Sequence, residues 1–141
     1  MLVRQVMNRK VIIAKPEVSL RQASEVMTNF HIGCLVVTNG GKILGILTSS
    51  DIIKAIAGGK DPEKTLIEGV MTKNVKIIEP DKDIEEAVAL MVENRIKKLP
   101  VVDGDKLVGI ITASDIVSIE PKLLENLASL MSLKTSGYTG G

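Results

Sequence analysis

The chain has 141 residues, of which 45% are hydrophobic and 25% are charged, and its net charge is +1. This length fits one compact domain or two very small ones, and the hydrophobic fraction is enough for a packed core. The near balance of charge leaves no electrostatic footprint for duplex nucleic acid or for an anionic membrane surface.

No apolar run approaches the roughly 18 residues that a membrane span needs, and the first ten residues lack the apolar core of a secretory signal. We therefore expect a cytoplasmic protein with no membrane segment. Cys34 is the single cysteine, so the sequence predicts no internal disulfide and no cysteine-based zinc site. With no Trp and one Phe, the chain is also poor in the aromatic side chains that stack on nucleic-acid bases.

The predicted elements follow one order in the first part of the chain. A short β-rich run over residues 11–14 is followed by a helix, for which Ser19 and Gln22 have the spacing of a capping box. Two strands then flank Asn39-Gly40, a strong hairpin turn signal, and a second helix is predicted over residues 49–57.

The same order returns in the second part, because residues 6–55 align with residues 70–119 without a gap. The repeat predicts a strand over residues 75–78, a helix capped by Asp83 and Glu86, a hairpin turn at Asp103-Gly104 and a helix over residues 113–119. Only two copies are present, which is typical of a pseudo-symmetric pair and not of a solenoid.

We therefore predict an α/β (α+β) protein with two β-α-β-β-α repeats. A unit of about 50 residues buries little surface by itself, so we expect the copies to share one core. The final helix is rich in leucine and could pack on its own core or dock on a sister chain or partner. The predicted segments are repeat 1 (1–57), a linker (58–69), repeat 2 (70–119), a C-terminal helix (120–133) and a flexible tail (134–141).

The stretch "GILTSSDI" of the first copy returns as "GIITASDI" in the second, and both place a Thr and an Asp at the start of a helix. One interpretation is local: Thr48 with Asp51, and Thr112 with Asp115, cap their helices and bind nothing. The other is chemical. A helix N-terminus at a strand tip suits a phosphate, and an acidic residue there can hold the hydroxyls of a ribose.

The two repeats, each ending in G-h-h-T-x-S-D, and the "LPVVD" of the second copy together resemble a tandem pair of CBS domains, named for cystathionine β-synthase. The resemblance covers residues 6–119. It implies a regulatory module, also called a Bateman module, which binds AMP, ADP, ATP or S-adenosylmethionine in clefts between the repeats. It further implies a homodimer, an unidentified regulated protein as partner, and no catalytic, metal or cofactor site.

The family's binding roles can be carried over to matching positions. Asp51 and Asp115 would hold ribose hydroxyls, and the strand-start positions would line the adenine and ribose pocket. The hydroxyls that would contact phosphate are those of Thr48, Ser50, Thr112 and Ser114, and the pocket-lining residues are Ile32, Leu35, Ile96, Leu99 and Pro100.

The two copies differ where the family places basic groups that reach phosphates. The second copy has Lys97 and Lys98 there, whereas the first has Gly33 and Cys34. We expect the site around Asp115 to prefer a ligand with more phosphate. Two other functions stay open at this point: a small nucleotide-hydrolysing enzyme, which would need a general base and usually a metal, and RNA binding through the lysines.

Overall fold

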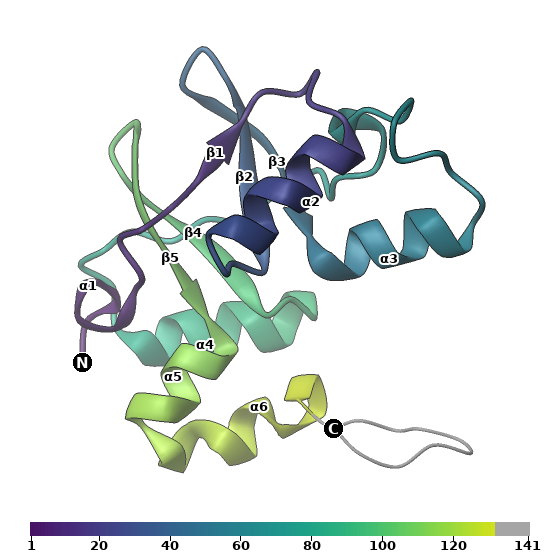
Figure 1. Cartoon of the computed structure of the whole chain (residues 1–141). Helices are drawn as coiled ribbons and strands as arrows, with labels where there is room; N and C mark the ends of the chain where they lie inside the picture. Colours follow the sequence, from purple (N-terminus) through teal and green to yellow (C-terminus); the bar gives the residue numbers. More distant parts are fainter. Residues whose placement is uncertain (132–141) are drawn as a thin grey trace, which may run out of the picture. The chain divides into compact units, whose positions relative to one another are not determined.

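The computed structural model describes residues 1–131 and divides them between two compact units (Figure 1). We call Lys10–Lys76 together with Gly104–Lys106 the first-repeat unit. The second-repeat unit consists of Met1–Arg9, Ile77–Asp103 and the chain from Leu107 onward. The predicted tail and the last two residues of the predicted C-terminal helix lie outside the described residues.

The first-repeat unit is built on a three-stranded sheet in the order β1-β2-β3. β1 runs parallel to β2, and β2 and β3 form an antiparallel hairpin in which Leu35 pairs with Leu47. The elements are β1 (Ile13–Ala14), α2 (Leu20–Asn29), β2 (Cys34–Asn39), β3 (Lys42–Thr48), α3 (Ser49–Ala57) and the 3-10 helix η1 (Ile67–Gly69).

The second-repeat unit is built on the two-stranded sheet β4-β5. Its helices are more numerous than those of the first, because segments from both ends of the chain join it. The elements are α1 (Val3–Val6), α4 (Ile84–Asn94), β4 (Lys98–Asp103), β5 (Lys106–Thr112), α5 (Ala113–Ile119), the 3-10 helix η2 (Pro121–Leu123) and α6 (Leu124–Met131).

Both predicted capping boxes are confirmed. The Gln22 N–H donates to Ser19 Oγ, and the Ser19 N–H donates back to Gln22 Oε1, each at 3.1 Å. In the second copy the Asp83 N–H donates to Glu86 Oε2 at 3.3 Å. These bonds satisfy amide groups that have no partner within the helix, which explains why α2 and α4 begin where the sequence predicted.

The two helices also end alike. His31 and Arg95 occupy the same repeat position, and both have positive φ angles, 54° and 53°. A left-handed residue ends a helix and turns the chain. The next residue, Ile32 or Ile96, donates its N–H back into the helix and leads into the following strand.

The predicted hairpin turns are also confirmed. Gly40 has a φ of 60° and Gly104 a φ of 62°, a conformation that glycine adopts without steric cost.

The strand predicted over residues 75–78 is wrong, because only an isolated parallel bridge between Ile78 and Val101 forms there. The difference between the copies lies at Pro100. In the first copy the N–H of Val36 donates to Ile12 O at 3.2 Å and supports β1. Pro100 stands at the equivalent position and has no N–H to donate, so the ladder is shorter.

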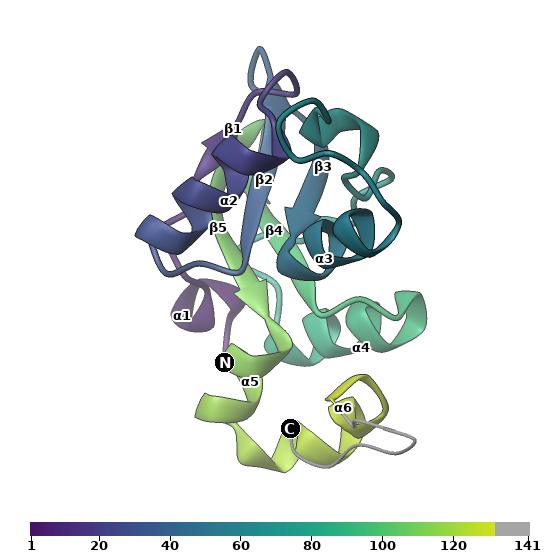
Figure 2. The same cartoon turned by 45° about the vertical axis from the view of Figure 1, so that its right-hand side comes forward.

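In the first-repeat unit, α2 and α3 pack on one face of the hairpin (Figure 2). Alternate residues of a strand point to the same face, so the strand residues of this core are two apart or directly paired. The cluster contains Leu20, Ala23, Met27, Leu35, Val37, Leu47, Ile52, Ala55 and Ile67.

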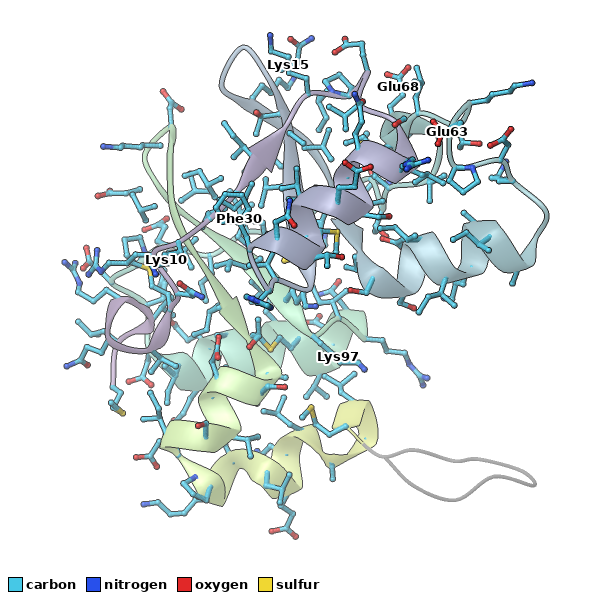
Figure 3. All side chains as sticks on the ribbon, in the orientation of Figure 1. Lys10, Lys15, Phe30, Glu63, Glu68 and Lys97 are labelled. Atoms are coloured by element: carbon cyan, nitrogen blue, oxygen red, sulfur yellow. The ribbon has the colours of Figure 1, made fainter. Side chains whose placement is uncertain are left out.

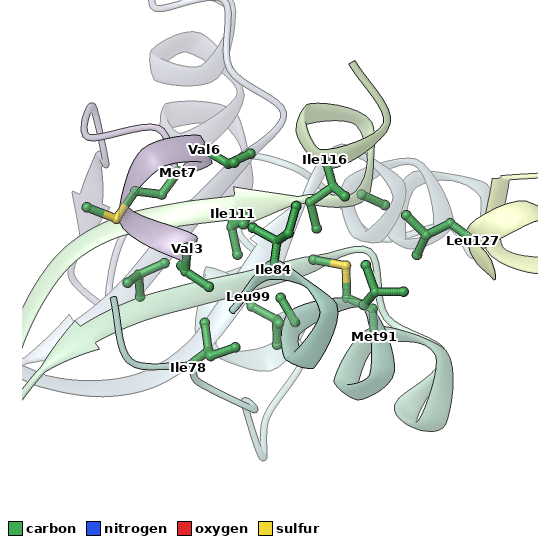
Figure 4. Packing of buried hydrophobic residues seen from close by; sticks show 14 residues of the cluster. Val3, Val6, Met7, Ile78, Ile84, Met91, Leu99, Ile111, Ile116 and Leu127 are labelled. Carbon is green, nitrogen blue, oxygen red and sulfur yellow. The ribbon is translucent and has the colours of Figure 1, made fainter. Parts of the chain in front are cut away.

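The second-repeat unit has its own cluster, to which α6 contributes the fully buried Leu127 (Figure 4). α6 packs against α4 and α5, so the C-terminal helix lies on its own unit, one of the two alternatives left open by the sequence. Each unit has one hydrophobic cluster of its own. A core shared by the two copies stays a prediction.

Each core is completed by a segment that comes from the other repeat. Met1–Arg9 are part of the predicted repeat 1 but belong to the second-repeat unit. Asn8 and Ile110 exchange backbone hydrogen bonds of 2.8 and 2.9 Å, and the Val3 N–H donates to Lys82 O at 2.8 Å. In the same way, Thr72 exchanges backbone hydrogen bonds with Ile46 in the first-repeat unit.

Two glycines permit these close approaches. A Cβ on Gly45 would lie 2.6 Å from Thr72 O, and a Cβ on Gly109 would lie 2.7 Å from Met7 Sδ. These are the glycines that open "GILTSSDI" and "GIITASDI". Their role is therefore to let the exchanged segment lie against β3 or β5, the strands that carry the Thr and Asp of the candidate site.

Candidate functional site

The first-repeat site begins where β3 passes directly into α3. Thr48 is the last residue of β3 and the N-cap of α3. Asp51 N–H donates to Thr48 Oγ1 at 3.2 Å, and Thr48 N–H donates to Asp51 Oδ2 at 2.9 Å. Thr48 and Asp51 therefore cap α3, and one carboxylate oxygen of Asp51 already accepts a hydrogen bond from the backbone.

The second-repeat site repeats only half of this arrangement. Asp115 N–H donates to Thr112 Oγ1 at 3.1 Å, which caps α5. Within residues 1–131, however, the Asp115 carboxylate makes no hydrogen bond and no ion pair. Asp115 is also half-buried. Its carboxylate is thus available to accept hydrogen bonds from a ligand without first releasing a backbone group.

A backbone hydrogen bond joins the start of each strand to the start of the helix. Ser49 N–H donates to Gly33 O at 3.1 Å, and Ala113 N–H donates to Lys97 O at 2.8 Å. The bond brings half-buried Ile32 or Ile96, which directly precedes the accepting residue, to the helix start. The structure therefore places residues from three elements together within each unit. The sequence did not indicate these carbonyl acceptors, because they are backbone atoms.

Hydroxyl groups and lysine side chains also lie at these helix and strand starts. Ser50 and Ser114 are exposed in the first turns of α3 and α5. Lys97 is exposed just before β4 (Figure 3). Lys98, the first residue of β4, is half-buried. Neither lysine forms an ion pair within the described chain, so both can offer their charge to an anion.

Three of the predicted pocket residues are buried. The side chains of Leu35 and Leu99 belong to the two hydrophobic clusters, whereas Pro100, the neighbour of Leu99 in β4, belongs to neither cluster. Because successive strand residues point to opposite faces, Leu99 and Pro100 face different sides of β4. The role of these residues in lining a ligand pocket stays a prediction.

The residues described contain no group of three or more His, Cys, Asp or Glu side chains that could hold a metal ion. In that same part of the chain, no helix is long and apolar enough to cross a membrane.

The family model described as the CBS domain matches residues 3–58 and again residues 67–122. The chain belongs to the CBS-domain family. An uncharacterized protein of Methanopyrus kandleri, MK0525, is 35% identical over 132 residues, which cover 92% of this chain and 67% of that protein. The resemblance read from the two T-x-S-D stretches is thereby confirmed.

Solved CBS structures have the same mixed α/β fold. The CBS-domain containing protein ATU1752 from Agrobacterium tumefaciens matches with a TM-score of 0.78 and 31% identity, over 84% of this chain and 98% of that one. The CBS domain pair of protein MJ0100, solved in complex with 5′-methylthioadenosine and S-adenosylmethionine, matches with a TM-score of 0.77 and 31% identity, over 86% and 97% of the two chains.

The unequal use of the two carboxylates in this CBS pair leads to a prediction about stability. Asp51→Ala is expected to lower the free energy of unfolding by about 1 kcal/mol, because the Thr48 N–H loses its acceptor. Asp115→Ala removes no such bond and is expected to cost less than about 0.5 kcal/mol. Urea unfolding followed by circular dichroism measures both. Equal losses would contradict the difference.

Proposed function

We propose that this CBS pair is a regulatory module whose main site for an adenosine ligand lies at the helix start of the second repeat. The single observation that carries the proposal is the Asp115 carboxylate, half-buried at the start of α5 and without a partner among the described residues. A carboxylate in this position can accept two hydrogen bonds from vicinal hydroxyls, which is what a ribose offers.

The other groups near Asp115 suit the rest of a nucleotide. The hydroxyls of Thr112 and Ser114 can donate to phosphate oxygens, and Lys97 and Lys98 add positive charge beside them. Ile96 supplies apolar surface for a base. The described residues contain no group of His, Cys, Asp or Glu side chains that could hold a metal ion, and this set supports binding over hydrolysis.

The first-repeat site has the same hydroxyls, on Thr48 and Ser50, but no lysine at the strand start. It offers less to phosphate, and Asp51 has to share its carboxylate with the backbone of Thr48. We propose that this site accepts an adenosine ligand with little negative charge or stays empty. The MJ0100 complex with 5′-methylthioadenosine and S-adenosylmethionine shows that a related CBS pair binds such ligands.

Regulation follows if the ligand favours one conformation of the chain over another, since only differential affinity shifts an equilibrium. The output would then be read by a protein partner, with the CBS pair acting as a homodimer. The adenosine compound is the ligand that the module senses, and it does not act as a cofactor.

A thermal-shift screen tests the function. AMP, ADP, ATP, 5′-methylthioadenosine and S-adenosylmethionine are each added to the full chain, and consumption of the ligand is followed by chromatography. A ligand at about 100 times its dissociation constant stabilises the native state by about 2.7 kcal/mol, which raises the melting temperature by several degrees. Turnover of ATP would favour the enzyme, and no shift with any of the five compounds would refute the proposal.

A further inference from the structure

The segment that precedes α4 runs beside β4 and has its other edge open. It pairs with β4 through Ile78, whose N–H donates to Pro100 O at 3.1 Å and whose carbonyl accepts from the Val102 N–H at 2.9 Å. The Ile78 side chain points into the core of the second-repeat unit (Figure 4). Successive residues of a strand turn their backbone groups to opposite edges, so those of Ile77 and Glu79 point away from β4.

The outward backbone groups of this segment have no hydrogen-bond partner within residues 1–131. They are the N–H and C=O of Val75 and Ile77 and the N–H of Glu79, whereas Glu79 O accepts the Lys82 N–H at 3.3 Å. Ile77 is also 49% exposed. We call residues 75–79 the open edge. A row of unpaired donors and acceptors is a template on which a further strand can form.

A groove of about 310 Å³ lies beside the open edge and reaches α4. Its apolar lining comes from Ile77, Ile78 and Leu90, and its charged lining comes from Glu79, Lys82 and Glu86. Among the described residues, no ion pair joins Lys82 to either glutamate. Glu86 keeps one carboxylate oxygen for a ligand, because its Oε2 alone accepts the Asp83 N–H. The groove thus offers two carboxylates against one ammonium group, together with apolar surface.

The equivalent edge of the first repeat has a different character. Lys15, Val18 and Gln22 stand where the second repeat has Glu79, Lys82 and Glu86. Val18 packs against the hydrophobic cluster of its own unit, whereas Lys82 is exposed. The first repeat therefore has no carboxylate at these three positions, and the acidic groove beside the edge is a feature of the second repeat.

We propose that the open edge binds an extended segment of a partner protein as an added β-strand, and that this segment carries an apolar and a basic side chain two residues apart. Its backbone pairs with the outward groups of Ile77 and Glu79, and addition of a strand to a sheet edge is a recurrent mode of peptide recognition. Side chains two residues apart lie on one face, so both enter the groove. The apolar side chain contacts Leu90, and the basic side chain meets Glu79 and Glu86.

A second copy of the chain is a poorer occupant of this edge. Two copies paired through it would each bring Glu79 and Glu86, and like charges across paired strands are destabilising. A basic segment meets the same carboxylates with opposite charge. The proposal goes beyond nucleotide binding and does not rest on it, so its test is made without nucleotide.

The probe is the end-blocked heptapeptide Thr-Lys-Thr-Val-Thr-Lys-Thr, which places its valine and both lysines on one face of a strand. It is titrated into the isotope-labelled full chain and followed by amide NMR. We expect saturable shifts that are largest for Val75, Ile77 and Glu79, because their N–H groups gain acceptors. The peptide with glutamate in place of both lysines should bind at least about fivefold more weakly, since two attractions become repulsions.

Ile77→Pro removes the N–H at the centre of the open edge, a group without an acceptor within residues 1–131. It should raise the dissociation constant of the peptide at least about tenfold, because proline blocks strand addition at an edge. The matched control is Ile13→Pro, the same substitution at the equivalent position of the first repeat. It should change the affinity less than about twofold, and circular dichroism should show both variants folded.

A second pair of variants tests the charge and leaves the backbone unchanged. Glu79→Lys should weaken binding at least about threefold, an effect typical of exposed ion pairs that are reversed. Glu93→Lys makes the same change at an exposed position of α4 outside the groove and should alter the affinity less than about 1.5-fold.

Absence of saturable shifts overturns the proposal. Equal effects of Ile77→Pro and Ile13→Pro, or of Glu79→Lys and Glu93→Lys, mean that the peptide binds elsewhere and overturn it too. Equal affinity for the lysine and glutamate peptides removes the basic partner from it. A chain dimer that Ile77→Pro dissociates, without peptide binding, makes a second copy the occupant and also overturns it.

Discussion

Replacing Asp115 with alanine is expected to raise the dissociation constant for an adenine nucleotide by about 30-fold or more while the fold survives. Hydrogen bonds to a charged group contribute about 1.5–3 kcal/mol each, and about 1.4 kcal/mol corresponds to a factor of ten in affinity. The carboxylate has no partner among the described residues, so its loss removes ligand contacts and leaves the backbone hydrogen bonds of α5 in place. Isothermal titration calorimetry measures the change.

The control variant is Ser118→Ala, which truncates an exposed side chain later in α5. It should leave the affinity within about twofold, because it retains Thr112, Ser114 and Asp115. Asp51→Ala is expected to weaken ATP binding less than Asp115→Ala. Unchanged affinity in Asp115→Ala would show that the ribose assignment is wrong, and a larger loss at Asp51 would reverse the ranking of the two sites.

Val3→Asp is expected to lower the free energy of unfolding by about 4 kcal/mol, a large share of the 5–15 kcal/mol typical of a domain. Val3 has 0% exposed surface and lies in the core of the second-repeat unit (Figure 4). The substitution would bury a carboxylate with no partner in that core. Urea unfolding measures the loss.

Leu2→Asp is the matched control, because Leu2 is 37% exposed and precedes α1 at its N-cap, where aspartate is favoured. It should change the free energy of unfolding by less than about 0.5 kcal/mol. Hydrogen exchange locates the effect: in Val3→Asp, amides of α4 and β5 should lose protection more than those of α2 and β3. Greater loss in α2 and β3 would mean that the first residues stabilise their own repeat.

Much of the fold could be predicted from the sequence because it depends on neighbours in the chain. Ser19 and Gln22 are three residues apart, and their mutual hydrogen bonds form within one helical turn. Gly40 adopts its left-handed conformation because the hairpin turn requires it. The alignment of residues 6–55 with 70–119 then extended each local prediction to a second place in the chain.

The candidate sites were predicted in part. The T-x-S-D stretches indicated both helix starts, and the repeat indicated the contrast between Lys97 and Gly33. The face to which each strand residue points could not be predicted from its nearness to the strand start. Leu35 and Leu99 are each the second residue of a strand, β2 or β4, and their side chains belong to the hydrophobic clusters.

By itself the sequence determined the two repeats, their caps and turns, the places where Thr and Asp begin a helix, and the family resemblance. Only the tertiary structure decided that Met1–Arg9 complete the second-repeat unit and that α6 packs against α4 and α5 of its own unit. It also decided that, among the described residues, the Asp51 carboxylate accepts a backbone hydrogen bond and the Asp115 carboxylate does not. The physical reason is the distance along the sequence between the residues that interact. Caps and turns form between residues a few positions apart, whereas burial and segment exchange depend on which distant side chains fill the same space.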